Sequence, residues 1–227
     1  METSVVRDAR IMSACQRANG AVAITCGATL SAPTSFRAEP RVRECSSTTS
    51  PPGVGRVLDL GTGDGRLLAM LARERPHLRG VGLDVSHVML DAARTRFGGE
   101  ENIQLVEHDL VNPLPQLGRF GAVVSSMAIH HLEHERKRSL YAEVFDLLEP
   151  GGVFANFDHV ASPTHRLHLA FFAAIGEPLE HEDPSDRLLD VETQLVLLRE
   201  IGFDDVDCYW KWREMALLVG IKPGDHA

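Results

Sequence analysis

The strongest constraint on the fold is a regular alternation of short apolar strands and helix-like segments from Arg56 onward. The predicted strands are residues 56–60, 79–85, 103–110, 121–129 and 153–160. The predicted helices between them run from the glycine-rich turn to about residue 75, over 86–97, and from about 133 to 148. Strands that alternate with helices in this way form a parallel sheet covered by helices on both faces.

The C-terminal part departs from this alternation. A predicted helix over 190–202 is followed by two strands, 205–212 and 214–222, with almost no residues between them. Such a short connection cannot hold a crossover helix, so the two strands should pair as an antiparallel hairpin. The predicted fold is α/β: a Rossmann-like, doubly wound, seven-stranded and mostly parallel sheet with a C-terminal antiparallel hairpin.

The first 50 residues differ in composition from the rest of the chain. They are rich in Ser, Thr, Ala and Arg and lack sustained periodicity, and Ser46–Gly53 has the composition of a linker. We expect residues 1–50 to be an irregular or disordered leader and residues 51–227 to be the folded domain. A targeting peptide is the alternative, which two acidic residues among the first ten positions disfavour.

Composition limits the classes of partner. The net charge of −9 argues against a large nucleic-acid footprint, although a local basic patch would still allow a transfer RNA. The four cysteines are scattered and form no CxxC pair, which indicates a reducing compartment and a cytoplasmic protein. No apolar run reaches the ~20 residues of a membrane span. The sequence carries no signal of oligomeric state.

A glycine-rich turn follows the first predicted strand in the stretch VLDLGTGDG. Gly61, Gly63 and Gly65 form the pattern G-x-G-x-G. The dinucleotide fingerprint is G-x-G-x-x-G, and its third glycine position holds Arg66 here. This difference disfavours a nicotinamide-dependent oxidoreductase.

Acidic residues at the predicted strand ends indicate a positively charged ligand. Asp59 and Asp64 lie beside and within the turn and would repel a pyrophosphate. S-adenosylmethionine carries a sulfonium and an ammonium group and no phosphate. Asp84 ends the second strand, where a carboxylate accepts hydrogen bonds from ribose hydroxyls. Asp109 follows the third strand, where it would accept a hydrogen bond from an adenine amino group.

The motifs VLDLGTGDG, GLDVS, EHDL, SSMAIHHL and LLEPGG occur in the order seen in class I S-adenosylmethionine-dependent methyltransferases. The chain resembles that family over about residues 54–222. The resemblance implies that Asp59, Gly61 and Gly63 contact the methionine part, Asp84 the ribose and Asp109 the adenine. It also implies an apolar contact from Met89, for which core packing is the alternative.

Two features depart from the family pattern. Gly121, after Phe120, occupies the position before the fourth strand where members often have an aspartate. Many members also carry an aromatic-containing helix upstream of the glycine-rich turn that covers the cofactor. Residues 1–50 offer only Phe36 as a counterpart.

Methyl transfer requires a general base only when the acceptor must lose a proton. His130, after the fourth strand, and His159, at the end of the fifth, are the predicted candidates. The alternative is structural: the neighbouring His131 caps or braces the next helix, and Asp158 fixes a loop. We predict no metal site, because His165, His168 and His181 form no recognised metal-binding motif.

Residues 161–189 lie between the fifth strand and the next helix, and we expect them to form a substrate cover. Their apolar helix carries Phe171 and Phe172, which either line an acceptor pocket or pack on the core. Trp210 and Trp212 alternate on a strand and are interpreted as sheet packing.

The predicted function is S-adenosylmethionine-dependent methyl transfer to a small-molecule acceptor. One alternative is a transfer-RNA wobble-uridine-modifying enzyme of the same fold, because GFDDVDCYWKW is similar to the tail of those enzymes. The other is a non-catalytic protein that binds S-adenosylmethionine.

Overall fold

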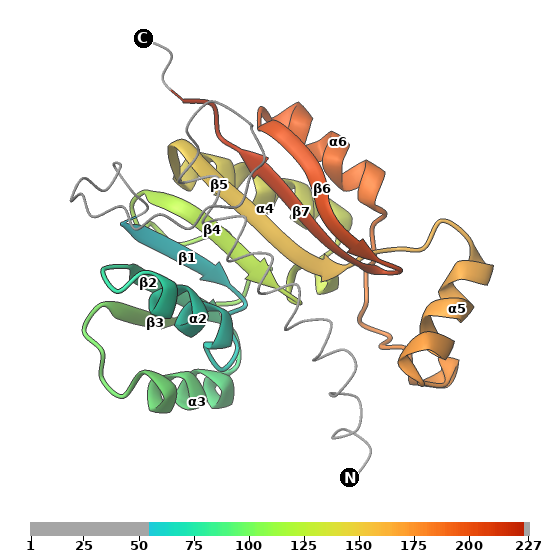
Figure 1. The fold of residues 1–227 in the computed structure, drawn as a ribbon, viewed down its shortest axis with the longest axis horizontal. Coiled ribbons are helices and arrows are strands. Elements are labelled where there is room, and N and C mark those ends of the chain that lie inside the picture. The colour runs from blue at the N-terminus through green and yellow to red at the C-terminus, as the bar shows by residue number, and fades with distance from the viewer. Residues whose placement is uncertain (1–54, 225–227) are drawn as a thin grey trace, which may run out of the picture.

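The structure is a computed structural model that describes residues 55–224, shown in Figure 1. The predicted leader, with Phe36, lies outside the described residues. Seven strands form one sheet in the order β3-β2-β1-β4-β5-β7-β6. The strands are β1 (Arg56–Leu60), β2 (Arg79–Asp84), β3 (Ile103–Glu107), β4 (Phe120–Ser126), β5 (Leu148–His159), β6 (Asp204–Trp212) and β7 (Met215–Ile221).

Neighbouring strands from β3 to β5 are parallel, whereas β7 is antiparallel to both β5 and β6. The predicted fold class, with its C-terminal antiparallel hairpin, is therefore confirmed. Strand β5 starts earlier than predicted, at Leu148 instead of Val153. Backbone hydrogen bonds of 2.9 and 2.8 Å join Gly151 and Gly152 to Lys222, and they keep this Pro-Gly-Gly stretch extended beside the end of β7.

Helices cover both faces of the sheet. They are α2 (Arg66–Glu74), α3 (His87–Phe97), α4 (His134–Leu147), α5 (His165–Ile175) and α6 (Val191–Ile201), with short 3-10 turns η1 (Ile129–His131) and η2 (Leu179–His181). Helices α4 and α6 pack into one apolar cluster with the sheet, and α2, α3 and α5 contribute to a second. None of the helices in residues 55–224 combines the length and hydropathy of a membrane span.

Local sequence explains where several helices begin and end. The Ser86 hydroxyl accepts a hydrogen bond from the Met89 N–H at the start of α3, as the sequence predicts for an N-cap. Helix α3 ends at Gly98, which adopts a left-handed conformation. Helix α2 instead starts from Gly65, which is also left-handed, so the glycine-rich turn leads directly into that helix.

Residues 161–189 leave the sheet and return to it, because the Ala161 N–H donates to the Leu189 carbonyl across 3.2 Å. Helix α5 of this segment lies beyond the ends of β6 and β7 (Figure 1). Phe171 and Phe172 are buried in the core cluster that contains β7. Of the two sequence-based interpretations of these rings, the structure shows core packing. Trp210 packs against Phe157, as expected for sheet packing.

Candidate functional site

A pocket of about 750 Å³ opens at the carboxyl ends of β1, β2 and β4. This is where a doubly wound sheet binds ligands, at the point where the strand order changes direction. All six residues predicted to bind a cofactor line the pocket: Asp59, Gly61, Gly63, Asp84, Met89 and Asp109. The parallel register brings them together, because they lie at or after the carboxyl ends of β1, β2 and β3, which are neighbours in the sheet.

Positive φ angles shape the glycine-rich turn between β1 and α2. Gly61 has φ of 69° and Gly63 has φ of 55°, which residues with a side chain rarely adopt. A Cβ atom at Gly61 would lie 2.2 Å from the Cβ of Ala128. Glycine at position 61 therefore allows the turn to pass against the residues that follow β4.

Asp84 joins the turn to the end of β2. Its two carboxylate oxygens accept hydrogen bonds from the Gly63 and Ser86 N–H groups, each at 2.8 Å. A carboxylate oxygen can accept more than one hydrogen bond. Both oxygens of Asp84 can therefore still accept a hydroxyl of a vicinal diol, such as a ribose.

Asp59 is a buried carboxylate with an oxygen that lacks a partner. One oxygen accepts a hydrogen bond of 2.7 Å from the Thr62 hydroxyl, while Oδ1 has no hydrogen-bond partner and the residue is 1% exposed. Burial, together with the nearby charge of Asp84, raises the pKa of Asp59 from 3.8 to about 7. A cationic group in the pocket would provide the missing partner and favour the charged form.

The remaining predicted residues line the outer part of the pocket. Met89 is 41% exposed, which excludes the core-packing alternative. Asp109 is exposed, and its Oδ1 accepts a hydrogen bond of 3.0 Å from the Val111 N–H, so it also caps a turn. Val85 and Val111 are both 62% exposed and supply apolar wall on either side.

Several other residues line the pocket that were not predicted from the sequence. His108 lines it with a buried Nε2 that lacks a hydrogen-bond partner. Met127 and Ala128, directly after β4, form another wall, and Met127 has a left-handed backbone with φ of 58°. Their position directly after a predicted strand could have indicated from the sequence that they line the pocket. Their residue types do not indicate a binding role.

Comparison with known proteins finds methyltransferases that are similar to this chain. Residues 57–152 match a family model described as a methyltransferase domain. This match, the relatives and a solved structure support the predicted resemblance to the class I S-adenosylmethionine-dependent methyltransferases. S-adenosylmethionine is the cofactor of that family, and the residues of the pocket fit it. The Asp59 oxygen without a hydrogen bond fits its ammonium group, and the Asp84 carboxylate fits its ribose. The glycine-rich turn, which has no side chains at Gly61 and Gly63, leaves room for its methionine part.

Individual relatives agree with this assignment. An uncharacterized methyltransferase of Mycobacterium tuberculosis is 37% identical over 129 residues, which are 56% of this chain and 62% of the relative. The ubiquinone/menaquinone biosynthesis C-methyltransferase of Desulfotalea psychrophila is 37% identical over 131 residues, 56% of this chain and 52% of the relative. The chain thus spans less than two thirds of the length of these two relatives.

A solved structure has the same fold. The S-adenosylmethionine-dependent methyltransferase SibL, solved in its apo form, superimposes with a TM-score of 0.59 and 27% identity. The match covers 75% of this chain and 51% of SibL. The sheet described above is therefore that of a methyltransferase domain.

The two histidines predicted as bases, His130 and His159, do not line the pocket. His130 is buried, and its Nδ1 lies 2.5 Å from the Asp158 carboxylate. His159 contacts Glu214 at 3.0 Å and Asp186 at 3.3 Å. Burial lowers the pKa of His159, but hydrogen bonds to the two carboxylates outweigh it and raise that pKa to about 9.

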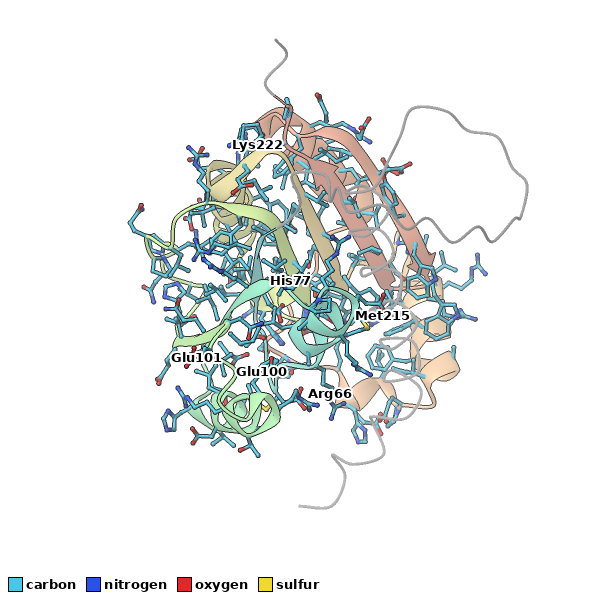
Figure 2. All side chains as sticks on the ribbon, turned by 60° about the vertical axis from the view of Figure 1, so that its left-hand side comes forward. Arg66, His77, Glu100, Glu101, Met215 and Lys222 are labelled. Carbon is cyan, nitrogen blue, oxygen red and sulfur yellow. The ribbon has the colours of Figure 1, made fainter. Side chains whose placement is uncertain are left out.

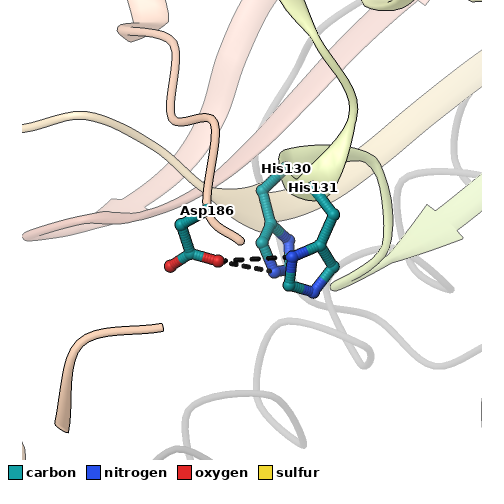
Figure 3. A group of neighbouring side chains, drawn as sticks. All are labelled: His130, His131 and Asp186. Atoms are coloured by element: carbon teal, nitrogen blue, oxygen red, sulfur yellow. Dashed lines mark ion pairs between the residues drawn. The ribbon is translucent and has the colours of Figure 1, made fainter. Parts of the chain in front are cut away.

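His131 is the neighbouring histidine that does line the pocket. Figure 3 shows its ring beside that of His130, with both facing the carboxylate of Asp186 from the 161–189 segment. Burial is the largest influence on Asp186 and raises its pKa, but the hydrogen bond from His159 and the nearby histidines lower it below the ordinary value overall. Chain segments more than 50 residues apart thus meet at this edge of the pocket.

Proposed function

We propose that this protein transfers a methyl group from S-adenosylmethionine to a small-molecule acceptor. The observation that carries the proposal is the convergence of Asp59, Asp84 and the glycine-rich turn in one pocket. When bound, S-adenosylmethionine supplies a methyl carbon activated by a sulfonium, which a nucleophilic atom of the acceptor displaces to leave S-adenosylhomocysteine.

Different residues of the pocket contact different parts of the cofactor. In this proposal Asp59 pairs with the ammonium group, and its burial strengthens the attraction because little water competes. Asp84 accepts hydrogen bonds from the ribose hydroxyls. Asp109, with the apolar Met89, contacts the adenine, and its outer position in the pocket supports that role.

In this proposal the acceptor enters beside Met127, Ala128 and His131, because these residues line the pocket and have no assigned contact with the cofactor. The 161–189 segment contacts His131 through Ser185 and Asp186, which supports its predicted role as a substrate cover. The name of the Desulfotalea relative refers to quinone biosynthesis, which supports a small organic acceptor.

The predicted base roles of His130 and His159 have less support, because both rings contact carboxylates and neither lines the pocket. They stay predictions. So do the transfer-RNA and non-catalytic alternatives.

Calorimetry tests cofactor binding, and labelled transfer tests catalysis. We expect micromolar binding of S-adenosylhomocysteine and none of NADH. Incubation of the protein with labelled S-adenosylmethionine and a small-metabolite extract should give a labelled product. Tight binding with no labelled product would favour the non-catalytic alternative, and absence of binding would contradict the proposal.

Asp84→Ala gives a residue-level test. Loss of its hydrogen bonds to the ribose should weaken S-adenosylhomocysteine binding by about 1–3 kcal/mol, or roughly 5- to 150-fold in Kd. Asp91→Ala is the control, because Asp91 is an exposed acid of α3 that pairs with Arg94 outside the pocket. Unchanged affinity in Asp84→Ala would refute the role assigned to this carboxylate.

A further inference from the structure

Two histidines and one aspartate meet at the edge of the pocket (Figure 3). Each of His130, His131 and Asp186 offers one ligand atom, and these atoms all lie within 4.8 Å of one another. Asp186 Oδ1 is 3.7 Å from His130 Nε2 and 3.4 Å from His131 Nδ1. We propose that these three side chains bind a divalent transition-metal ion of the Zn²⁺ type.

The spacing of the ligand atoms fits such an ion. Zinc binds histidine nitrogen and carboxylate oxygen at about 2.0–2.2 Å, so neighbouring ligands of a tetrahedral ion stand about 3.4 Å apart. The two distances to Asp186 Oδ1 are close to that value. An ion placed among the three atoms would need only small side-chain adjustments.

Hydrogen bonds on the far side of the ligands already orient two of them. The Nδ1 of His130 donates to Asp158, which leaves Nε2 with a free electron pair directed at Asp186. The Nδ1 of His159 faces Asp186 Oδ2 at 3.3 Å. A carboxylate behind a histidine ligand is a common outer partner in metal sites, because it fixes the ring and its tautomer.

Asp186 has an oxygen available for coordination. Its side chain is 10% exposed, and Oδ1 is buried without a hydrogen-bond partner. A buried carboxylate oxygen that accepts no hydrogen bond is unfavourable unless a cation compensates for it. This oxygen accepts no hydrogen bond and faces the two histidine nitrogens, at 3.7 and 3.4 Å. Its lack of a hydrogen bond is an observation independent of the residue types in the cluster.

The backbone holds Asp186 against η1. The Arg187 N–H donates to the His130 carbonyl across 3.0 Å. The buried Lys137 ammonium donates to the carbonyls of His130 and Arg187, at 3.1 and 2.6 Å. These bonds fix the loop that carries the carboxylate to the turn that carries both histidines, so little ordering remains to be done when an ion binds.

The His131 side of the cluster is accessible to an ion from the pocket. Its side chain is 44% exposed and lines the pocket, whereas His130 and Asp186 are nearly covered. Its Nδ1 now contacts the Ser185 hydroxyl at 3.0 Å, while that hydroxyl lies 2.7 Å from Asp183 and can donate to it. Coordination would replace one neutral hydrogen bond of His131 by a metal–nitrogen bond.

The donor set selects the class of ion. Two imidazoles and one carboxylate suit zinc and other late first-row ions, whereas Mg²⁺ and Ca²⁺ prefer oxygen ligands. Three protein ligands leave at least one coordination position for water or another oxygen. If the proposed function holds, that position would take a hydroxyl or carboxylate oxygen of the methyl acceptor.

Titration of the full chain with ZnCl₂ after chelator treatment tests the site, without cofactor or acceptor present. We expect about one ion per chain at micromolar Kd, and at least about tenfold weaker binding in both His131→Ala and Asp186→Asn. His77→Ala is the control, since His77 is exposed in the turn between α2 and β2 (Figure 2). Circular dichroism establishes whether each variant is folded. If Asp186→Asn does not fold, His131→Ala alone tests the site, because His131 is exposed.

Cobalt provides a second readout. Co²⁺ bound by two imidazoles and a carboxylate in a tetrahedral site absorbs visible light far more strongly than the aqueous ion, and we expect this absorption to disappear in His131→Ala. No saturable zinc binding, or zinc binding equally affected in His131→Ala and His77→Ala, would overturn the proposal. Because neither titration contains S-adenosylmethionine, a negative result leaves the methyltransferase proposal intact.

Discussion

Asp59 illustrates how a single residue is placed for binding at the expense of stability. Its carboxylate is fully buried and lacks one partner, so the free protein keeps it protonated up to a pKa of about 7. The unfolded chain releases that proton near pH 3.8. The unfolded state therefore binds fewer protons between these two values, and the free energy of unfolding falls as the pH rises from about 4 to 7.

Asp59→Asn should remove this loss of stability. At pH 4 the variant and the original protein should differ little, whereas at pH 8 the variant should be more stable, by on the order of 4 kcal/mol. Urea denaturation at the two pH values measures the difference. The surface substitution Asp91→Asn should show no such pH dependence. A variant that is no more stable at pH 8 would show that Asp59 is not buried as described.

The same substitution should weaken cofactor binding. Asparagine keeps the shape and can accept the Thr62 hydrogen bond, but it lacks the charge that would pair with an ammonium group. We expect at least about tenfold weaker binding of S-adenosylhomocysteine, because hydrogen bonds between charged groups contribute about 1.5–3 kcal/mol. Calorimetry at pH 8 makes the comparison. Stability gained together with unchanged affinity would contradict the pairing of Asp59 with the ammonium.

At the scale of an element, the turn between β1 and α2 depends on both conformation and space. Gly61→Ala introduces a left-handed alanine and a contact of 2.2 Å with the Ala128 Cβ. Gly98→Ala is a matched control, because its φ of 58° is similar and no atom lies within 4 Å of the added Cβ. The control should cost about 1–2 kcal/mol of stability. Gly61→Ala should cost clearly more and abolish cofactor binding, as thermal denaturation and calorimetry would measure.

Strands and helices were predictable where the local sequence determines them. Much of the pocket was predictable as well. The apolar runs and the cap at Ser86 placed strands and helices within a few residues, and the acids at strand ends follow from parallel topology. The start of β5 was not predictable, because its Pro-Gly-Gly stretch is kept extended by bonds to Lys222, 70 residues away. The position of His131 on the pocket wall was not predictable either, since it depends on the left-handed Met127 and on contacts with the 161–189 segment.

At the scale of the whole molecule, the last strand in the sequence lies inside the sheet. Strand β7 pairs with β5 on one side and β6 on the other, and six of its seven residues are buried. Leu218→Ala, at a position that is 1% exposed, should therefore cost about 2–4 kcal/mol of unfolding free energy. Leu169→Ala, on α5 and 43% exposed, should cost much less. Equal losses in denaturant titrations would show that β7 is not part of the core.

Cofactor binding should stabilise the whole domain, because the pocket draws on the ends of β1, β2 and β4 together. A ligand that binds only the folded state at one hundred times its Kd adds about 2.7 kcal/mol to the free energy of unfolding. For a domain of this size that is a rise in Tm of roughly 5–10 °C. Thermal denaturation with S-adenosylhomocysteine should show this rise, NADH should produce none, and Asp84→Ala should show a smaller rise at the same ligand concentration. A cofactor that binds in calorimetry but leaves Tm unchanged would have to bind the unfolded chain equally well, and the pocket at the ends of these strands would then not be its site.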